Sequence, residues 1–176
     1  MTFLGVCYKG KNNDVNSSVG LLISILVCYP EVAAINFDPE KQLLRFTFMY
    51  SKVLIDNELN DLKARLLSSI EVYNLLEGKD NNVILLNSQI CDNLTIIEVQ
   101  RDVNTLVQEE ITLIVELFRQ YFNNNLVTEG YDYYIEEEIV AQEEMIGHML
   151  ERMKGTSQDK YLFAFREEGK VLVFDK

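Results

Sequence analysis

The chain has 176 residues, with 16 Lys and Arg against 28 Asp and Glu, which gives a formal net charge of -12. This charge repels phosphate backbones and anionic lipid headgroups, and the basic residues form no cluster, so nucleic acid and membrane surfaces are excluded as expected partners. The hydrophobic content of 48% excludes intrinsic disorder, and eight glycines and two prolines exclude collagen-like or proline-rich chains. With no Gly-, Ser- or Pro-rich linker, residues 1–176 are predicted to form a single α+β domain.

The cysteines indicate a reducing compartment. Cys7, Cys28 and Cys91 are odd in number and lack the close pairs found in zinc and thioredoxin-like sites. The apolar run at residues 19–29 is shorter than the roughly 20 residues of a membrane-spanning helix. The polar, Asn-rich start of the chain does not resemble a secretory signal, and we therefore expect a cytoplasmic protein.

The first expected elements are a short strand at residues 3–8 and a buried element at residues 18–29. Ser18 and its two polar neighbours offer N-cap oxygens, which favours a helix for the second element. The β-branched residues of the apolar run would suit a buried strand equally well, and periodicity does not separate the two. Pro30 ends the element in either case.

Residues 32–50 are predicted to form a β-hairpin that a helix follows. A turn at residues 38–41 contains Pro39, and alternation after it predicts a strand with one buried face. Residues 56–77 have the three- and four-residue spacing of an amphipathic helix, with Asp56 as its expected cap and Gly78 at its end.

The same order, hairpin then helix, recurs in the next segment. Residues 83–101 predict a hairpin that turns at residues 92–93, and residues 103–123 predict a long helix. Residues 32–78 and 83–124 therefore share a layout without residue identity, which is at most an architectural duplication.

The last unit, residues 134–176, is predicted to be a helix and a hairpin. The helix covers residues 134–154, and strands at residues 161–166 and 170–174 are joined by a turn that contains Gly169. The expected order is α-ββ-α-ββ-α-α-ββ, with an antiparallel sheet of three hairpins packed against long helices. Because the last hairpin is apolar on both faces, it needs cover from its own helices or from a second copy, so a homo-oligomer is one expectation.

No motif identifies a reaction. His148 is the single histidine, so any Ser-His or Cys-His mechanism would pass through it. Glu144 and Glu151 lie four residues before and three residues after it, but this spacing differs from that of the di-metal carboxylate helices. Phosphate-binding loops and calcium loops are absent from the sequence. We therefore expect no catalytic residue, metal or cofactor.

The helix at residues 134–154 carries the one candidate binding surface. Its glutamates gather opposite the apolar stripe, and three tyrosines lie at its start, a combination that resembles a recognition surface for a basic protein. The candidate partner-binding residues are Tyr131, Tyr133, Tyr134, Glu136, Glu137, Glu143, Glu144, His148 and Glu151.

The alternative interpretation of this surface is a solvated face whose acids favour the helix dipole. The function predicted from the sequence is a non-enzymatic protein-interaction or regulatory domain. The alternatives are a small enzyme, or a protein that binds a small or apolar ligand, with a pocket that contains His148 and nearby acids.

Overall fold

The structure is a computed structural model, and it describes residues 5–9, 17–79, 84–128, 136–154 and 160–175. These residues form strands and helices in the order expected for an α+β protein. In chain order the elements are β1 (Gly5–Lys9), α1 (Ser17–Cys28), β2 (Ala34–Asp38), β3 (Leu43–Tyr50), α2 (Asp56–Leu76), β4 (Ile84–Cys91), β5 (Leu94–Asp102), α3 (Gln108–Phe122), a 3-10 turn (Asn123–Asn125), α4 (Glu136–Met153), β6 (Leu162–Glu167) and β7 (Lys170–Asp175).

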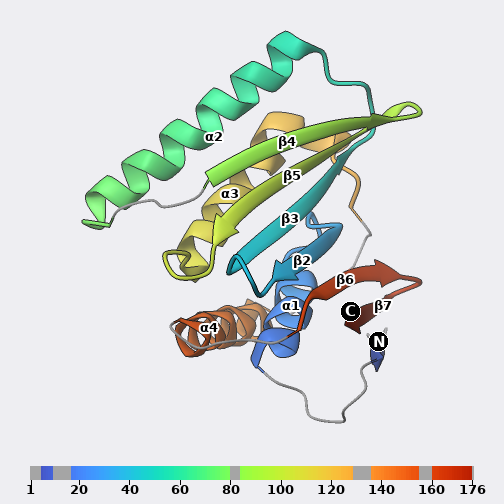
Figure 1. Cartoon of the computed structure of the whole chain (residues 1–176). Helices are drawn as coiled ribbons and strands as arrows, with labels where there is room; N and C mark the ends of the chain where they lie inside the picture. The colour runs from blue at the N-terminus through green and yellow to red at the C-terminus, as the bar shows by residue number, and fades with distance from the viewer. Residues whose placement is uncertain (1–4, 10–16, 80–83, 129–135, 155–159, 176) are drawn as a thin grey trace.

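The strands form one seven-stranded sheet with the order β1-β7-β6-β2-β3-β5-β4 (Figure 1). Every neighbouring pair is antiparallel except β1 and β7, which run parallel. The three predicted hairpins are confirmed as β2–β3, β4–β5 and β6–β7. The parallel pair joins the two ends of the chain and lies outside any hairpin, so no turn signal in the sequence indicates it.

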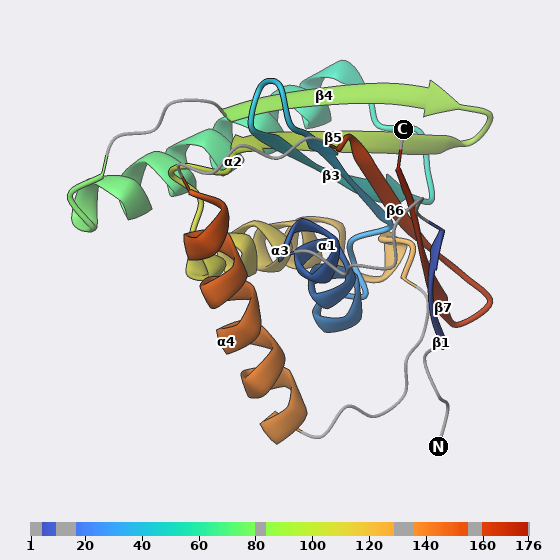
Figure 2. The same cartoon turned by 60° about the horizontal axis from the view of Figure 1, so that its bottom comes forward.

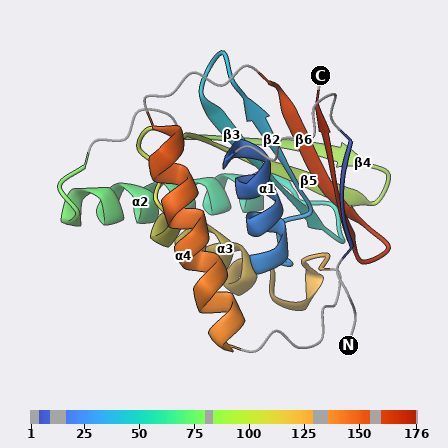
Figure 3. The same ribbon diagram turned by 90° about the horizontal axis from the view of Figure 1, so that it is seen from below.

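The four helices in the described part of the chain lie on the same side of the sheet (Figures 2 and 3). α1 packs against β2, β6 and β7, while α2 packs against α3. α4 packs on α1 and α3, away from the strands. The core lies between this helical layer and the sheet, where the rings of Phe48 in β3 and Phe118 in α3 stack with centroids 3.9 Å apart.

The burial of side chains explains why the sequence predicted β3 clearly but left α1 open between helix and strand. In β3 the alternating residues Leu44, Phe46 and Phe48 are buried, because one face of the sheet meets the helices. α1 is a helix, as expected, but it is apolar on most sides because the sheet and α4 enclose it. A helix covered from two sides has no polar face, so its sequence shows little helical periodicity.

The start of α3 and the N-cap residue of α2 differ from the predictions, whereas α2 begins at residue 56 as expected. α3 begins at Gln108 instead of residue 103, because the Asp102 carboxylate accepts the Thr105 amide at 3.0 Å and holds a turn there. The N-cap of α2 is Ile55 instead of Asp56, and the Glu58 carboxylate accepts the Ile55 amide at 3.2 Å.

Candidate functional site

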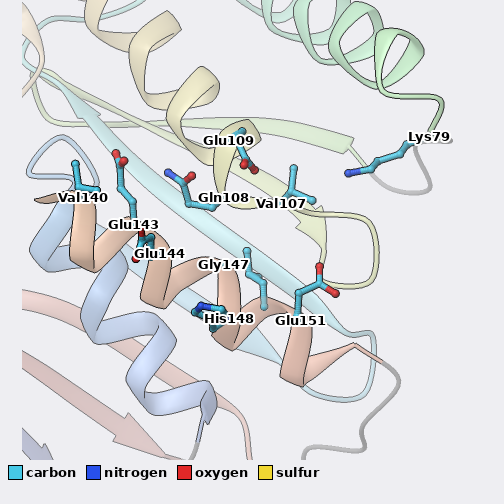
Figure 4. A pocket seen from close by; sticks show the side chains of 11 residues that line it. Lys79, Val107, Gln108, Glu109, Val140, Glu143, Glu144, Gly147, His148 and Glu151 are labelled. Atoms are coloured by element: carbon cyan, nitrogen blue, oxygen red, sulfur yellow. The ribbon is translucent and has the colours of Figure 1, made fainter.

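A groove of about 520 Å³ lies between α4, the start of α3 and the segment after α2 (Figure 4). We call it the acidic groove. Its charged and polar lining is Lys79, Gln108, Glu109, Glu143, Glu144, His148 and Glu151. Its apolar lining is Val107, Val140, Gly147 and Leu150.

The spacing of residues in α4 forms one wall of the groove. Glu144, His148 and Glu151 follow one another by four and three residues, so they share one side of the helix. Ile146 and Met153, both fully buried, hold another side in the core. α1 approaches α4 closely at Gly20, where a Cβ atom would lie 3.2 Å from the methyl carbon of Met149. This close packing holds α4 in place.

A buried ionic network positions the opposite wall. The Arg101 guanidinium and the Glu110 carboxylate are both fully buried, and Arg101 Nη2 donates to Glu110 Oε1 at 2.8 Å. Asn74, near the end of α2, donates to the same carboxylate at 2.9 Å. The network therefore ties together β5, the start of α3 and the end of α2, which are the elements that carry Glu109 and Lys79 to the groove.

Sequence reasoning missed this network. The signal available was an arginine, Arg101, between Val99 and Val103 in a stretch that reads as the buried end of a strand. Arginine is almost never fully buried unless it is paired, so its position there indicated an acidic partner. Which of the 28 acids would be that partner depends on the tertiary structure.

Gln108 is the groove residue with the clearest support from neighbouring side chains. Its Nε2 donates to the Tyr29 hydroxyl at 2.8 Å and to the Thr112 hydroxyl at 2.9 Å. Burial raises the pKa of the Tyr29 phenol above its usual range, so this hydroxyl stays neutral near neutral pH. The three side chains thus hold the first turn of α3 against the end of α1.

The groove is predominantly acidic. Among the described residues, four glutamates line it against one lysine, Lys79. Lys154 donates to the Glu151 carboxylate at 2.7 Å, and this bond and the attraction between the two charges lower the pKa of Glu151. Glu151 is therefore ionised at neutral pH, and its chemistry suits the attraction of a cation better than the donation of a proton.

The candidate residues from the sequence divide into three groups. Glu143, Glu144, His148 and Glu151 come together in the groove. Glu137 is exposed on α4 but is not part of the groove lining. Glu136 begins α4, but its side chain lies outside the described part of the structure, as do Tyr131, Tyr133 and Tyr134.

Within the described ranges, no three His, Cys, Asp or Glu side chains are arranged to hold a metal ion. None of the helices described is long and apolar enough to cross a membrane. No family model, curated protein or solved structure matches this chain.

Proposed function

We propose that the protein is a non-enzymatic binding module that docks a basic segment of a partner protein in the acidic groove. The observation that carries this proposal is the groove itself, which Glu109, Glu143, Glu144 and Glu151 line together with apolar Val107, Val140 and Leu150. Carboxylates beside apolar side chains complement a segment with apolar side chains on one side and lysines or arginines on the other. Such a segment would be attracted by the net charge of -12 as well.

Binding fits this geometry better than catalysis. A histidine that acts as a general base needs a partner that orients its ring. His148 is exposed, and the hydrogen bonds found between described residues do not involve it. The reducing compartment that we propose, the cytoplasm, is supported by the free thiols of Cys28 and Cys91.

The test compares the wild type with the double variant Glu144→Gln and Glu151→Gln. The probe is a synthetic amphipathic peptide with lysines along one helical face and leucines along the other, and calorimetry measures its affinity. We expect the variant to bind at least about tenfold more weakly at low salt, because two charges that face the peptide are lost. Stability should change by no more than about 0.5 kcal/mol, since both side chains are exposed.

The matched control is the double variant Glu167→Gln and Glu168→Gln. Both residues are exposed at the β6–β7 turn, and the substitutions change the net charge by the same amount. The control should bind the peptide as the wild type does. Equal losses in the two double variants would mean that only the overall charge attracts the peptide, and the proposal would be rejected.

We also propose that two copies of the chain associate through the open face of the C-terminal hairpin. On the helix side Leu162, Ala164, Val171 and Val173 are fully buried. On the other side the ring of Phe165 lies 5.4 Å from that of Phe163 and 5.7 Å from that of Phe174. Phe163 is 36% exposed, so this aromatic cluster has apolar surface that a second copy would cover.

A further inference from the structure

Strand β4 is the last strand of the sheet at the end opposite β1. Its eight residues pair with β5 in continuous register from Ile84–Arg101 to Cys91–Leu94, without a bulge. Its sequence, ILLNSQIC, contains no charged residue and no proline. Charges, prolines and bulges are the usual devices that keep another strand from pairing with an edge, and β4 lacks all three.

The strand is accessible on both of its faces. Leu85, which points to the open face of the sheet, is 52% exposed, and Ile90, which points to the helical side, is 57% exposed. The three residues between Leu86 and Ile90 are exposed as well. α2 runs beside β4 (Figure 1) without covering these side chains. An extended chain can therefore reach the outer hydrogen-bonding groups of β4.

A small pocket of about 100 Å³ lies along this edge. Asn87, Ser88 and Gln89 of β4 line it together with Ile96 and Glu98 of β5. In the register of the hairpin Asn87 is opposite Glu98 and Gln89 is opposite Ile96, so the four side chains share the open face. The amide oxygens of Asn87 and Gln89 accept hydrogen bonds, and Ile96 offers an apolar contact. The Glu98 carboxylate, which lies 3.6 Å from Arg45 in a partly exposed ion pair, can still accept a hydrogen bond from a second cation. This combination suits the aliphatic stem and cationic end of a lysine or arginine.

We propose that the β4 edge accepts an extended basic segment of a partner protein as an added strand, with one lysine or arginine side chain in this pocket. Charge complementarity selects this occupant over a second copy of the chain. A second β4 would bring only uncharged side chains to the pocket, and both copies carry a net charge of -12. The acidic groove belongs to other elements, so the inference does not rest on it.

The experiment uses the full chain, labelled with ¹⁵N, and a synthetic octapeptide of alternating valine and lysine. We expect the peptide to shift the amide signals of β4 and of its neighbour β5. A peptide in which proline replaces each valine has the same charge but lacks half of the backbone donors and cannot pair as a strand. It should bind at least about tenfold more weakly.

Opposite substitutions at Gln89 test the pocket. This side chain is exposed on the edge strand, so neither change should disturb the fold. Gln89→Lys should weaken binding of the valine-lysine peptide, and Gln89→Glu should strengthen it, because the charge faces the lysine of the peptide. The groove variant Glu144→Gln with Glu151→Gln should bind this peptide as the wild type does, which separates this inference from the proposed function.

Three results would overturn the inference. The first is equal affinity for the valine-lysine and proline-lysine peptides, which would show attraction by charge alone. The second is equal affinity of the two Gln89 variants. The third is a set of shifted amide signals that lies on α4 and leaves β4 unchanged.

Discussion

Burial of the Cys28 thiol links one residue to the pH dependence of stability. Burial and, to a smaller extent, the nearby Glu143 carboxylate together raise its pKa from 9.0 to about 12. The fold thus favours the neutral thiol, so its contribution to stability is complete below about pH 9 and is lost as the pH rises toward 12. We predict that the unfolding free energy of Cys28→Ala falls less between these two pH values than that of the wild type. Urea denaturation at each pH measures the difference.

Cys91 provides the matched control for this prediction. It is a free cysteine that is exposed at the end of β4. Cys91→Ala should leave the slope of stability against pH as it is in the wild type. If Cys28→Ala and the wild type lose the same free energy over this range, the burial of Cys28 is not the cause of the dependence.

The Arg101–Glu110 network acts at the scale of elements, because it joins β5, α2 and α3. Both partners are fully buried, and Arg101 also pairs with the Asp102 carboxylate, so removing Arg101 leaves the Glu110 charge in the core without its positive partner. We predict that Arg101→Met lowers the unfolding free energy by about 3 to 5 kcal/mol. The double variant Arg101→Met with Glu110→Leu should lose less, because the Glu110 charge is removed as well, while the Thr105 amide still donates to Asp102 at 3.0 Å. Chemical denaturation measures both.

An exposed ion pair in α2 is the control for the effect of burial on the Arg101–Glu110 pair. Arg65 and Asp61 of α2 are 3.1 Å apart, and their side chains are 66% and 49% exposed. Asp61→Ala should therefore cost no more than about 1 kcal/mol. A double variant of Arg101 and Glu110 as unstable as Arg101→Met would contradict the role assigned to the unpaired Glu110 charge.

At the scale of the whole molecule, all the helices in the described ranges lie on one face of the sheet, which leaves the other face open. We predict that the chain self-associates there, and that sedimentation at increasing concentration shows a rising average mass. Phe163→Ser should shift the equilibrium toward monomer, because Phe163 is the exposed member of the aromatic cluster.

Leu75→Ser is the control for self-association. Leu75 is 78% exposed on α2, away from the C-terminal hairpin. The substitution therefore removes apolar surface without changing the proposed contact. The control should associate as the wild type does. A wild-type chain that stays monomeric at all concentrations would show that no second copy covers the aromatic cluster.

The sequence predicted one wall of the acidic groove, the side of α4, but not the opposite wall. The spacing of Glu144, His148 and Glu151 placed them together on a helix, and the structure shows them lining one groove. Glu109 and Lys79 were not predicted, because they lie on elements far away in the sequence. Their approach depends on how the ends of α2 and α3 pack, which the Arg101–Glu110 network controls.

The sequence by itself determined the elements, because their causes are local. Alternation in β3, the spacing of α2 and the positive φ of 67° at Gly78 and 74° at Gly169 each act within a few residues. The strand order, the parallel β1–β7 pair, the place of β4 at the end of the sheet and the packing of the described helices on one face were decided only by the tertiary structure. These features arise from contacts between residues far apart in the chain, and short sequence patterns do not indicate which distant residues pack together.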